Sequence, residues 1–277
     1  LNGITGHTGT VAITGTNPTV TQLNTISTAT DGVVTATTTG TAAELAGLTT
    51  AGTDVITLTL TEGVAATVDQ LETINNATAG VITLNTETKA AVLSDTAVKL
   101  AAALTGTTGH TGTVSITGDN PTVTQLNTIS TATAGVVTAT TTGTATVLAG
   151  LTTAADDVIT LTLTEGVAAT VDELVTINGA TAGVITLNTE TKAAVLSDTA
   201  VKLAAALTGT TGHTGTVSIT GDNPTVTQLN TISTATDGVV TATITGTAAD
   251  LALLTTGAND VITLTLTEGV AATVDQL

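Results

Sequence analysis

The 277-residue sequence contains no cysteine, methionine, arginine, phenylalanine, tyrosine or tryptophan. The absence of cysteine excludes disulfides, zinc–thiolate sites and thiol nucleophiles. The absence of aromatic residues means that the core must be built from Val, Ile, Leu and Ala. These side chains suit thin, repeated layers better than one large globular centre.

Positive charge is scarce as well, with four lysines against 22 acidic residues and a net charge of −18. This balance argues against binding to nucleic acid or to an anionic membrane surface, because both need Lys and Arg. No apolar run reaches the roughly 18 to 20 residues of a membrane-spanning helix. Since 41% of the residues are hydrophobic, we expect a folded chain with no nucleic-acid partner and no direct membrane insertion.

What the chain does have is repetition with a period of 103 residues. The segment Thr5-Gly6-His7-Thr8-Gly9 returns at Thr108 and again at Thr211, and residues 80–113 are identical to 183–216. A fixed long period is typical of repeat arrays. We therefore divide the chain into super-repeats 1–106, 107–209 and a truncated third, 210–277, within one continuous segment covering residues 1–277.

Each period contains four smaller units. In the first, apolar and hydroxyl side chains alternate over residues 11–14, 34–37, 56–59 and 82–85, which predicts half-buried strands. Between them, apolar residues fall at helical spacing in 64–74 and 89–104. Asn17-Pro18 predicts an N-cap followed by proline at the first helical position. Thr41 and Glu44 predict a capping box, which Val147 removes from the second copy.

The repeated strand–helix unit predicts the fold class. A helical crossover makes neighbouring strands parallel and right-handed. We expect a right-handed α/β solenoid with one parallel sheet, an open Thr-rich face and uncapped ends, since neither Leu1 nor Leu277 lies in a polar capping unit. The alternative, a doubly wound sheet, needs strands that are continuously apolar, whereas here alternate positions are Thr.

The histidines His7, His110 and His213 occupy equivalent positions. They are expected four strands apart, about 19 Å at about 4.8 Å per strand, so they cannot share a metal ion. We expect them to be one surface residue repeated three times. The sequence also contains no nucleophile elbow, phosphate-binding loop or dinucleotide fingerprint. The sequence therefore predicts no catalytic residues, no organic cofactor and no enzymatic activity.

Two chemistries remain open for the aspartates that precede strands. Asp31 and Asp54 precede successive predicted strands, as do Asp237 and Asp260 in the third super-repeat. Stacked loops of this kind supply oxygen ligands for Ca²⁺. Asp before Gly is also ordinary turn chemistry.

The predicted strands leave one row of hydroxyl side chains on the face opposite the apolar one, because side chains alternate along a strand. This predicts an interaction face with almost no charge. Three interpretations stay open: Thr as a favourable exposed strand residue, lateral packing onto another copy, or binding of ordered water as in ice-binding proteins. The residues of this face are Thr35, Thr37, Thr57, Thr59, Thr61, Thr83, Ser115 and Thr117.

The phrases Thr21-Gln22-Leu23-Asn24-Thr25-Ile26 and Gly32-Val33-Val34-Thr35-Ala36-Thr37 resemble the Thr/Ala/Val/Gly-rich tandem repeats of very large bacterial surface proteins, notably of cyanobacteria. The resemblance covers nearly the whole chain and implies an extracellular or cell-surface location, and often calcium. We therefore expect a structural segment of an extracellular fibre, sheath or adhesin stalk that associates with itself. The alternative is a binding module for ice, glycan or another surface.

Overall fold

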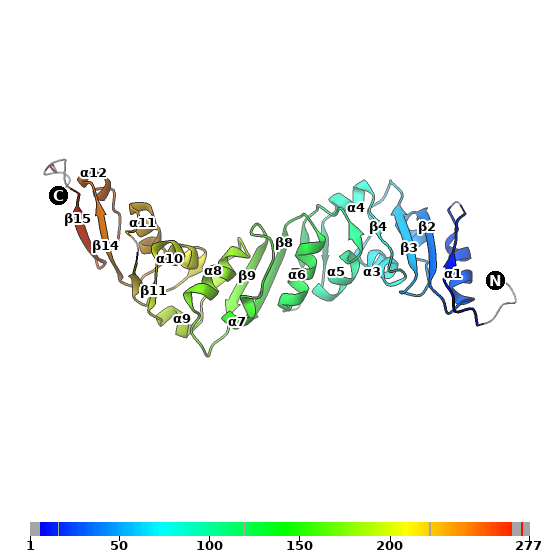
Figure 1. The fold of residues 1–277 in the computed structure, drawn as a ribbon, viewed down its shortest axis with the longest axis horizontal. Helices are drawn as coiled ribbons and strands as arrows, with labels where there is room; N and C mark the ends of the chain where they lie inside the picture. Colours follow the sequence, from blue (N-terminus) through cyan, green and yellow to red (C-terminus); the bar gives the residue numbers. More distant parts are fainter. Residues whose placement is uncertain (1–5, 16, 119, 222, 268–272, 274–277) are drawn as a thin grey trace. The chain divides into compact units, whose positions relative to one another are not determined.

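The computed structural model describes residues 6–15, 17–118, 120–221, 223–267 and 273. The chain forms two compact halves, residues 1–139 and 140–277. In both halves short strands alternate with helices (Figure 1). The division falls inside a strand, β8, and not at a boundary between super-repeats.

The elements of the first half are β1 (Val11–Ala12), α1 (Val20–Thr28), β2 (Val34–Gly40), α2 (Ala42–Leu45), β3 (Val55–Leu60), α3 (Val68–Asn76), β4 (Ile82–Thr83), α4 (Thr86–Ala90), β5 (Leu93–Asp95), α5 (Ala97–Leu104), β6 (Thr107–Thr108), β7 (Val114–Ile116), α6 (Val123–Ala132) and β8 (Val137–Gly143).

The elements of the second half repeat this order, following the 103-residue period. They are α7 (Ala145–Leu148), β9 (Val158–Leu163), α8 (Val171–Gly179), β10 (Ile185–Thr186), α9 (Thr189–Ala193), β11 (Leu196–Asp198), α10 (Ala200–Leu207), β12 (Thr210–Thr211), β13 (Val217–Ile219), α11 (Val226–Ala235), β14 (Val240–Gly246), α12 (Ala248–Leu251) and β15 (Val261–Leu266).

The described strands form three parallel sheets, where the sequence predicted one. One sheet lies in the first half, in the order β1-β2-β3-β4-β6, and one in the second half, in the order β11-β13-β14-β15. The remaining strands also pair in parallel within each half: β5 with β7 in the first, and β9 with β10 and β10 with β12 in the second. The prediction of alternating strands and helices with parallel pairing is confirmed, and that of a single sheet is wrong.

The sheet is divided because one strand–helix unit contains two strands. β4 ends after two residues, since the Asn85 side chain accepts a hydrogen bond from the Thr88 amide and starts α4. The chain then forms β5 before the helix α5. β4 pairs with β6, and β5 pairs with β7, so the ladder passes to a new sheet. The predicted single helix 89–104 is therefore wrong; it is α4, a strand and α5.

Two further helix predictions need correction. The helix expected over 64–74 begins at Val68, capped by Thr67, and Val64 is 79% exposed. The Asn17-Pro18 cap is wrong as well, because α1 begins at Val20 and Thr19 is its N-cap. The capping box of Thr41 and Glu44 is confirmed. At the equivalent position in the next super-repeat, Thr144 accepts from the Val147 amide but the reciprocal side-chain bond is absent, as predicted.

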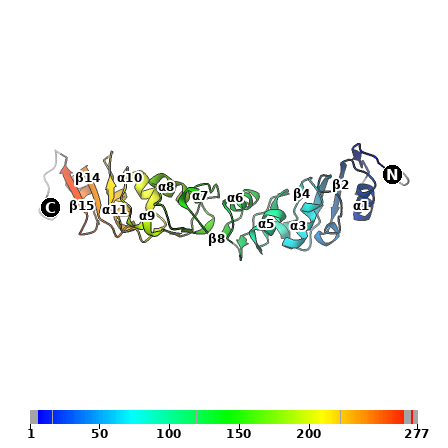
Figure 2. The same cartoon turned by 90° about the horizontal axis from the view of Figure 1, so that it is seen from below.

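The core is a single layer of aliphatic side chains between sheet and helices. In the first half, Ile56 and Leu58 of β3 are fully buried, as are Leu71 of α3 and Leu100 of α5. α3 and α5 pack side by side, as the second view shows (Figure 2). The helices thus cover one face of the sheet, which leaves the alternate residues of each strand on the other face.

Glycines mark the places where neighbouring backbones approach most closely. A Cβ added at Gly183 would clash with the carbonyl oxygen and carbon of Ile159 in the adjacent strand, and Gly80 has the same relation to Ile56. These glycines are thus required by the packing of one unit on the next.

We predict that Gly183→Ala destabilises the protein by about 1–3 kcal/mol, because the backbones must move apart to admit the methyl group. Gly179→Ala is the matched control: it ends α8, has open space around its Cβ position, and is expected to be neutral or stabilising by up to about 1 kcal/mol. Urea unfolding of both variants measures the difference. Equal stabilities would contradict the close-approach explanation.

Candidate interaction surface

The outer face of the first-half sheet carries rows of threonines in register across adjacent strands. Thr37 of β2 pairs with Thr57 of β3. One step further along the strands, Thr39 of β2 pairs with Thr59, which pairs with Thr83 of β4, and Thr83 pairs with Thr108 of β6. Neighbouring strands lie about 4.8 Å apart, so these hydroxyl and methyl groups form a regular lattice.

The structure brings together five of the eight residues predicted for this face: Thr35, Thr37, Thr57, Thr59 and Thr83. Thr35, Thr57, Thr59 and Thr83 are half-buried and Thr37 is exposed.

The other three predicted residues lie outside these paired strands. Thr61 directly follows β3; it is exposed and its amide donates to the Gly40 carbonyl, so it continues the outward alternation of Thr57 and Thr59. Ser115 belongs to a different sheet, in which it pairs with Ser94 and Thr138. Thr117 follows β7, and its amide donates to the Asp95 carbonyl.

Sequence reasoning missed four members of the face. Thr39 and Thr108 extend the row of Thr59 and Thr83. Val55 pairs with Thr35, and Val81 stands one residue before the inward-facing Ile82; they are 44% and 50% exposed. Continuing the strict alternation beyond the Thr-x-Thr pattern is the signal that finds them. We call the set Thr35, Thr37, Thr39, Val55, Thr57, Thr59, Val81, Thr83 and Thr108 the threonine face.

Equivalent rows occur in the second half. Thr162 of β9 pairs with Thr186 of β10, which pairs with Thr211 of β12. In the sheet of β14 and β15, Thr243 pairs with Thr263 and Thr245 with Thr265. The chain therefore presents the same arrangement of hydroxyls more than once.

The histidines are part of the fold, which corrects the prediction of a surface residue. His110 and His213 are 1% and 0% exposed. The Nδ1 atom of His110 lies 2.9 Å from Thr133 Oγ1, and its Nε2 lies 3.1 Å from the carbonyl oxygen of Ala91. The ring thus joins the unit before it to the unit after it. His7 is half-buried and makes the Nδ1 contact, with Thr30 at 3.2 Å.

Burial lowers the pKa of the His110 and His213 imidazoles below the ordinary histidine value, and the hydrogen bond to a backbone carbonyl partly opposes this effect. The folded state therefore binds fewer protons than the unfolded state. The stability that these groups contribute is present above the unfolded pKa of about 6.5 and is lost as the pH falls below it.

Two of the four calcium candidates, Asp54 and Asp260, have other partners. Asp54 is 1% exposed; its Oδ1 accepts from the Val34 amide at 2.7 Å and its Oδ2 from Ser27 Oγ at 2.7 Å. Asp260 accepts in the same way from the Val240 amide and Ser233 Oγ. Both carboxylates hold neighbouring units together, so their oxygens face protein donors and are poorly placed to bind an ion.

The other two candidates, Asp31 and Asp237, are exposed loop residues whose amides donate to the carbonyls of His7 and His213. Within the described ranges, no three His, Asp or Glu side chains are grouped so as to hold a metal ion.

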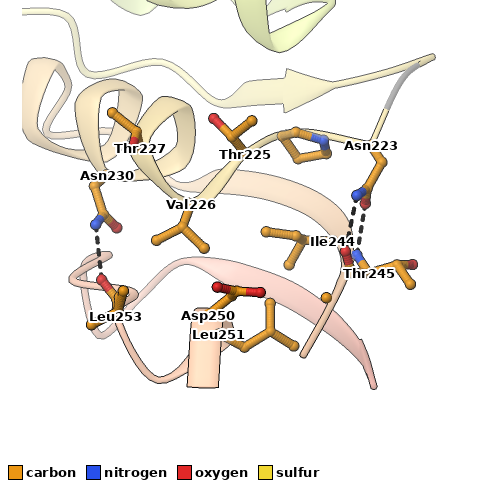
Figure 3. Close-up of a pocket in the computed structure, with 12 residues that line it drawn as sticks. Asn223, Thr225, Val226, Thr227, Asn230, Ile244, Thr245, Asp250, Leu251 and Leu253 are labelled. Atoms are coloured by element: carbon orange, nitrogen blue, oxygen red, sulfur yellow. Dashed lines mark hydrogen bonds between the residues drawn. The ribbon is translucent and has the colours of Figure 1, made fainter. Parts of the chain in front are cut away.

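A shallow groove of about 490 Å³ lies beside the start of α11 (Figure 3). Val226 of α11 faces Asp250 and Leu251 of α12 across it. Asn223 pairs with the backbone of Thr245 through both amide atoms, at 2.6 and 2.9 Å. Asn17 accepts likewise from the Thr39 amide in the first half, which explains the Asn-Pro motif: the asparagine extends the ladder beyond a short strand.

The lysines at the helices α5 and α10 link neighbouring helices. Lys99 Nζ lies 2.6 Å from Asp69 of α3 and 3.8 Å from Asp95, and Lys202 repeats this with Asp172 at 2.6 Å. The hydrogen bond and charge of Asp69 raise the pKa of Lys99. Sequence spacing alone indicates the weaker pair with Asp95, because Asp69 is 30 residues away.

No protein-family description, curated protein or solved structure matches this chain. None of the helices that the structure describes has the length and apolarity needed to span a bilayer.

We predict that the wild-type protein loses stability between about pH 7 and pH 5, and that His110→Gln and His213→Gln each remove part of this loss while the double variant removes most of it. Urea unfolding at both pH values measures the change. A pH dependence that is the same in the double variant and the wild type would contradict the assignment.

We predict that Asp54→Asn destabilises the fold by about 1–3 kcal/mol, because an amide NH₂ would replace one of the oxygens that accept from Val34 and Ser27. Asp31→Asn is the control, since Asp31 is exposed and its hydrogen bond to the His7 carbonyl is made by its backbone amide. Thermal unfolding with and without a chelator measures both effects. A loss of stability on chelation would instead favour a calcium role.

Proposed function

We propose that this protein is a structural repeat segment, a right-handed α/β solenoid that forms part of an extracellular fibre, sheath or cell-surface stalk. It associates with further copies end to end, through the threonine face, or both. The right-handed sense follows from the general preference of parallel strands joined by helical crossovers.

The proposal rests on one observation about the described units. Polar side chains form hydrogen bonds from one strand–helix unit to the next, and they are not gathered around a single site. Asn24 Nδ2 donates to the Gly47 carbonyl, and Asn75 Nδ2 to the Ala102 carbonyl, at 2.9 and 2.8 Å. Asn178 repeats the second bond at Ala205, also at 2.8 Å. Such nearest-neighbour stabilisation is the property of arrays that extend.

The location outside the cell rests on the resemblance to large bacterial surface repeats. The composition is compatible with it, because a chain without cysteine or methionine offers no sulfur to oxidise.

A second candidate function is binding of ordered water or a glycan surface. The in-register row Thr39, Thr59, Thr83 and Thr108 favours it, since it spaces hydroxyl and methyl groups regularly. Thermal hysteresis of the dispersed protein would support this function over the first, and its absence together with filament formation would support the first.

We predict that Thr57→Lys abolishes lateral association, because it places a charge at the centre of the threonine face, and that it leaves the folded state intact. Thr21→Lys is the matched control, with the same charge change on the exposed surface of α1. Electron microscopy and light scattering measure association, and circular dichroism measures folding. Unchanged bundling of a folded Thr57→Lys protein would contradict packing through this face.

A further inference from the structure

The acidic charge of this protein is segregated from the threonine face. No residue of β1, β2, β3, β4 or β6 is charged. Among the described strands, acidic residues occur in β5 and β11 only, at Asp95 and Asp198. The other described acids lie on helices and loops, such as Asp31 before β2 and Glu62 after β3.

This segregation identifies the partner that the face fits. A basic partner would be drawn to the acidic helices and loops. A second copy of this chain, also strongly acidic, can approach closely only where neither surface carries charge. The threonine face is such a surface, and it is self-complementary, because methyl and hydroxyl rows at one strand spacing meet rows at the same spacing. The second half carries equivalent rows of its own.

We propose that the threonine face pairs with the same face of a second copy and that ionic strength controls this pairing. The inference rests on the proposed self-association and adds its regulation. Two sheets packed face to face lie about 10 Å apart, which brings the acids at the strand ends of both copies near one another. Their repulsion extends over about 30 Å at 0.01 M salt and over about 8–10 Å at 0.1–0.15 M. This repulsion therefore opposes pairing at low salt, and pairing becomes favourable at physiological salt because the repulsion is screened.

The test measures the association constant of the full chain by sedimentation at 10, 150 and 500 mM NaCl. We expect an increase of about tenfold or more between 10 and 150 mM and little change above that. Constant association at all three concentrations would overturn the salt control and leave self-association standing. Absence of association throughout would overturn both, and association that weakens with salt would indicate an interface of ion pairs and overturn the uncharged-face pairing.

Variants assign the effect to the face and to the strand-end charges. Glu62→Gln combined with Glu165→Gln should raise association at 10 mM NaCl, because each substitution removes a negative charge at a strand end. The fold should be kept, since Gln still offers an acceptor to the amides of Thr86 and Thr189. Thr57→Lys should abolish the salt-promoted association; if it persists, another surface is the interface. MgCl₂ at equal ionic strength should act like NaCl, and association seen with MgCl₂ alone would replace the proposal by cation bridging.

Discussion

The structure depends on the bonding of backbone groups at the ends of very short strands. Thr78 shows the solution: its buried hydroxyl oxygen accepts from the amides of Ile56 and Gly80, at 2.8 Å each, and lies 3.0 Å from the Asp54 carbonyl. Asn85 similarly donates to the carbonyls of Thr61 and Val64. Because buried polar groups without partners are costly, these side chains let two-residue strands stack without aromatic residues in the core.

This bonding also explains the unusual composition. Threonine serves at three kinds of position: as helix N-cap, as buried partner of a neighbouring backbone, and as exposed residue on the outer face of the sheet. The first two roles fix the fold within each half, and the third leaves a surface free of charge. The acids are confined largely to helices and loops, so the strands of the first-half sheet carry no charge.

The sequence predicted what depends on local pattern and repetition. Alternation identified β1, β2, β3 and β4 but missed β5 and β6, and the capping box at Thr41 followed from four residues. The errors arose where residues far apart in the sequence determine the burial of a side chain or the pairing of a strand. His110 is buried because Ala91 and Thr133, 19 and 23 residues away, bond its ring. Neither these bonds nor the pairing that divides the sheet can be recognised from the spacing of neighbouring residues.

The central claim is that the protein works as an array whose strands stack along the direction of extension. Fibre diffraction from oriented assemblies tests it most directly. The account predicts a meridional reflection near 4.8 Å from strand stacking and a longer axial repeat of about 19 Å from the four-unit period. Assemblies whose 4.8 Å reflection lies on the equator, or which lack the longer repeat, would contradict it.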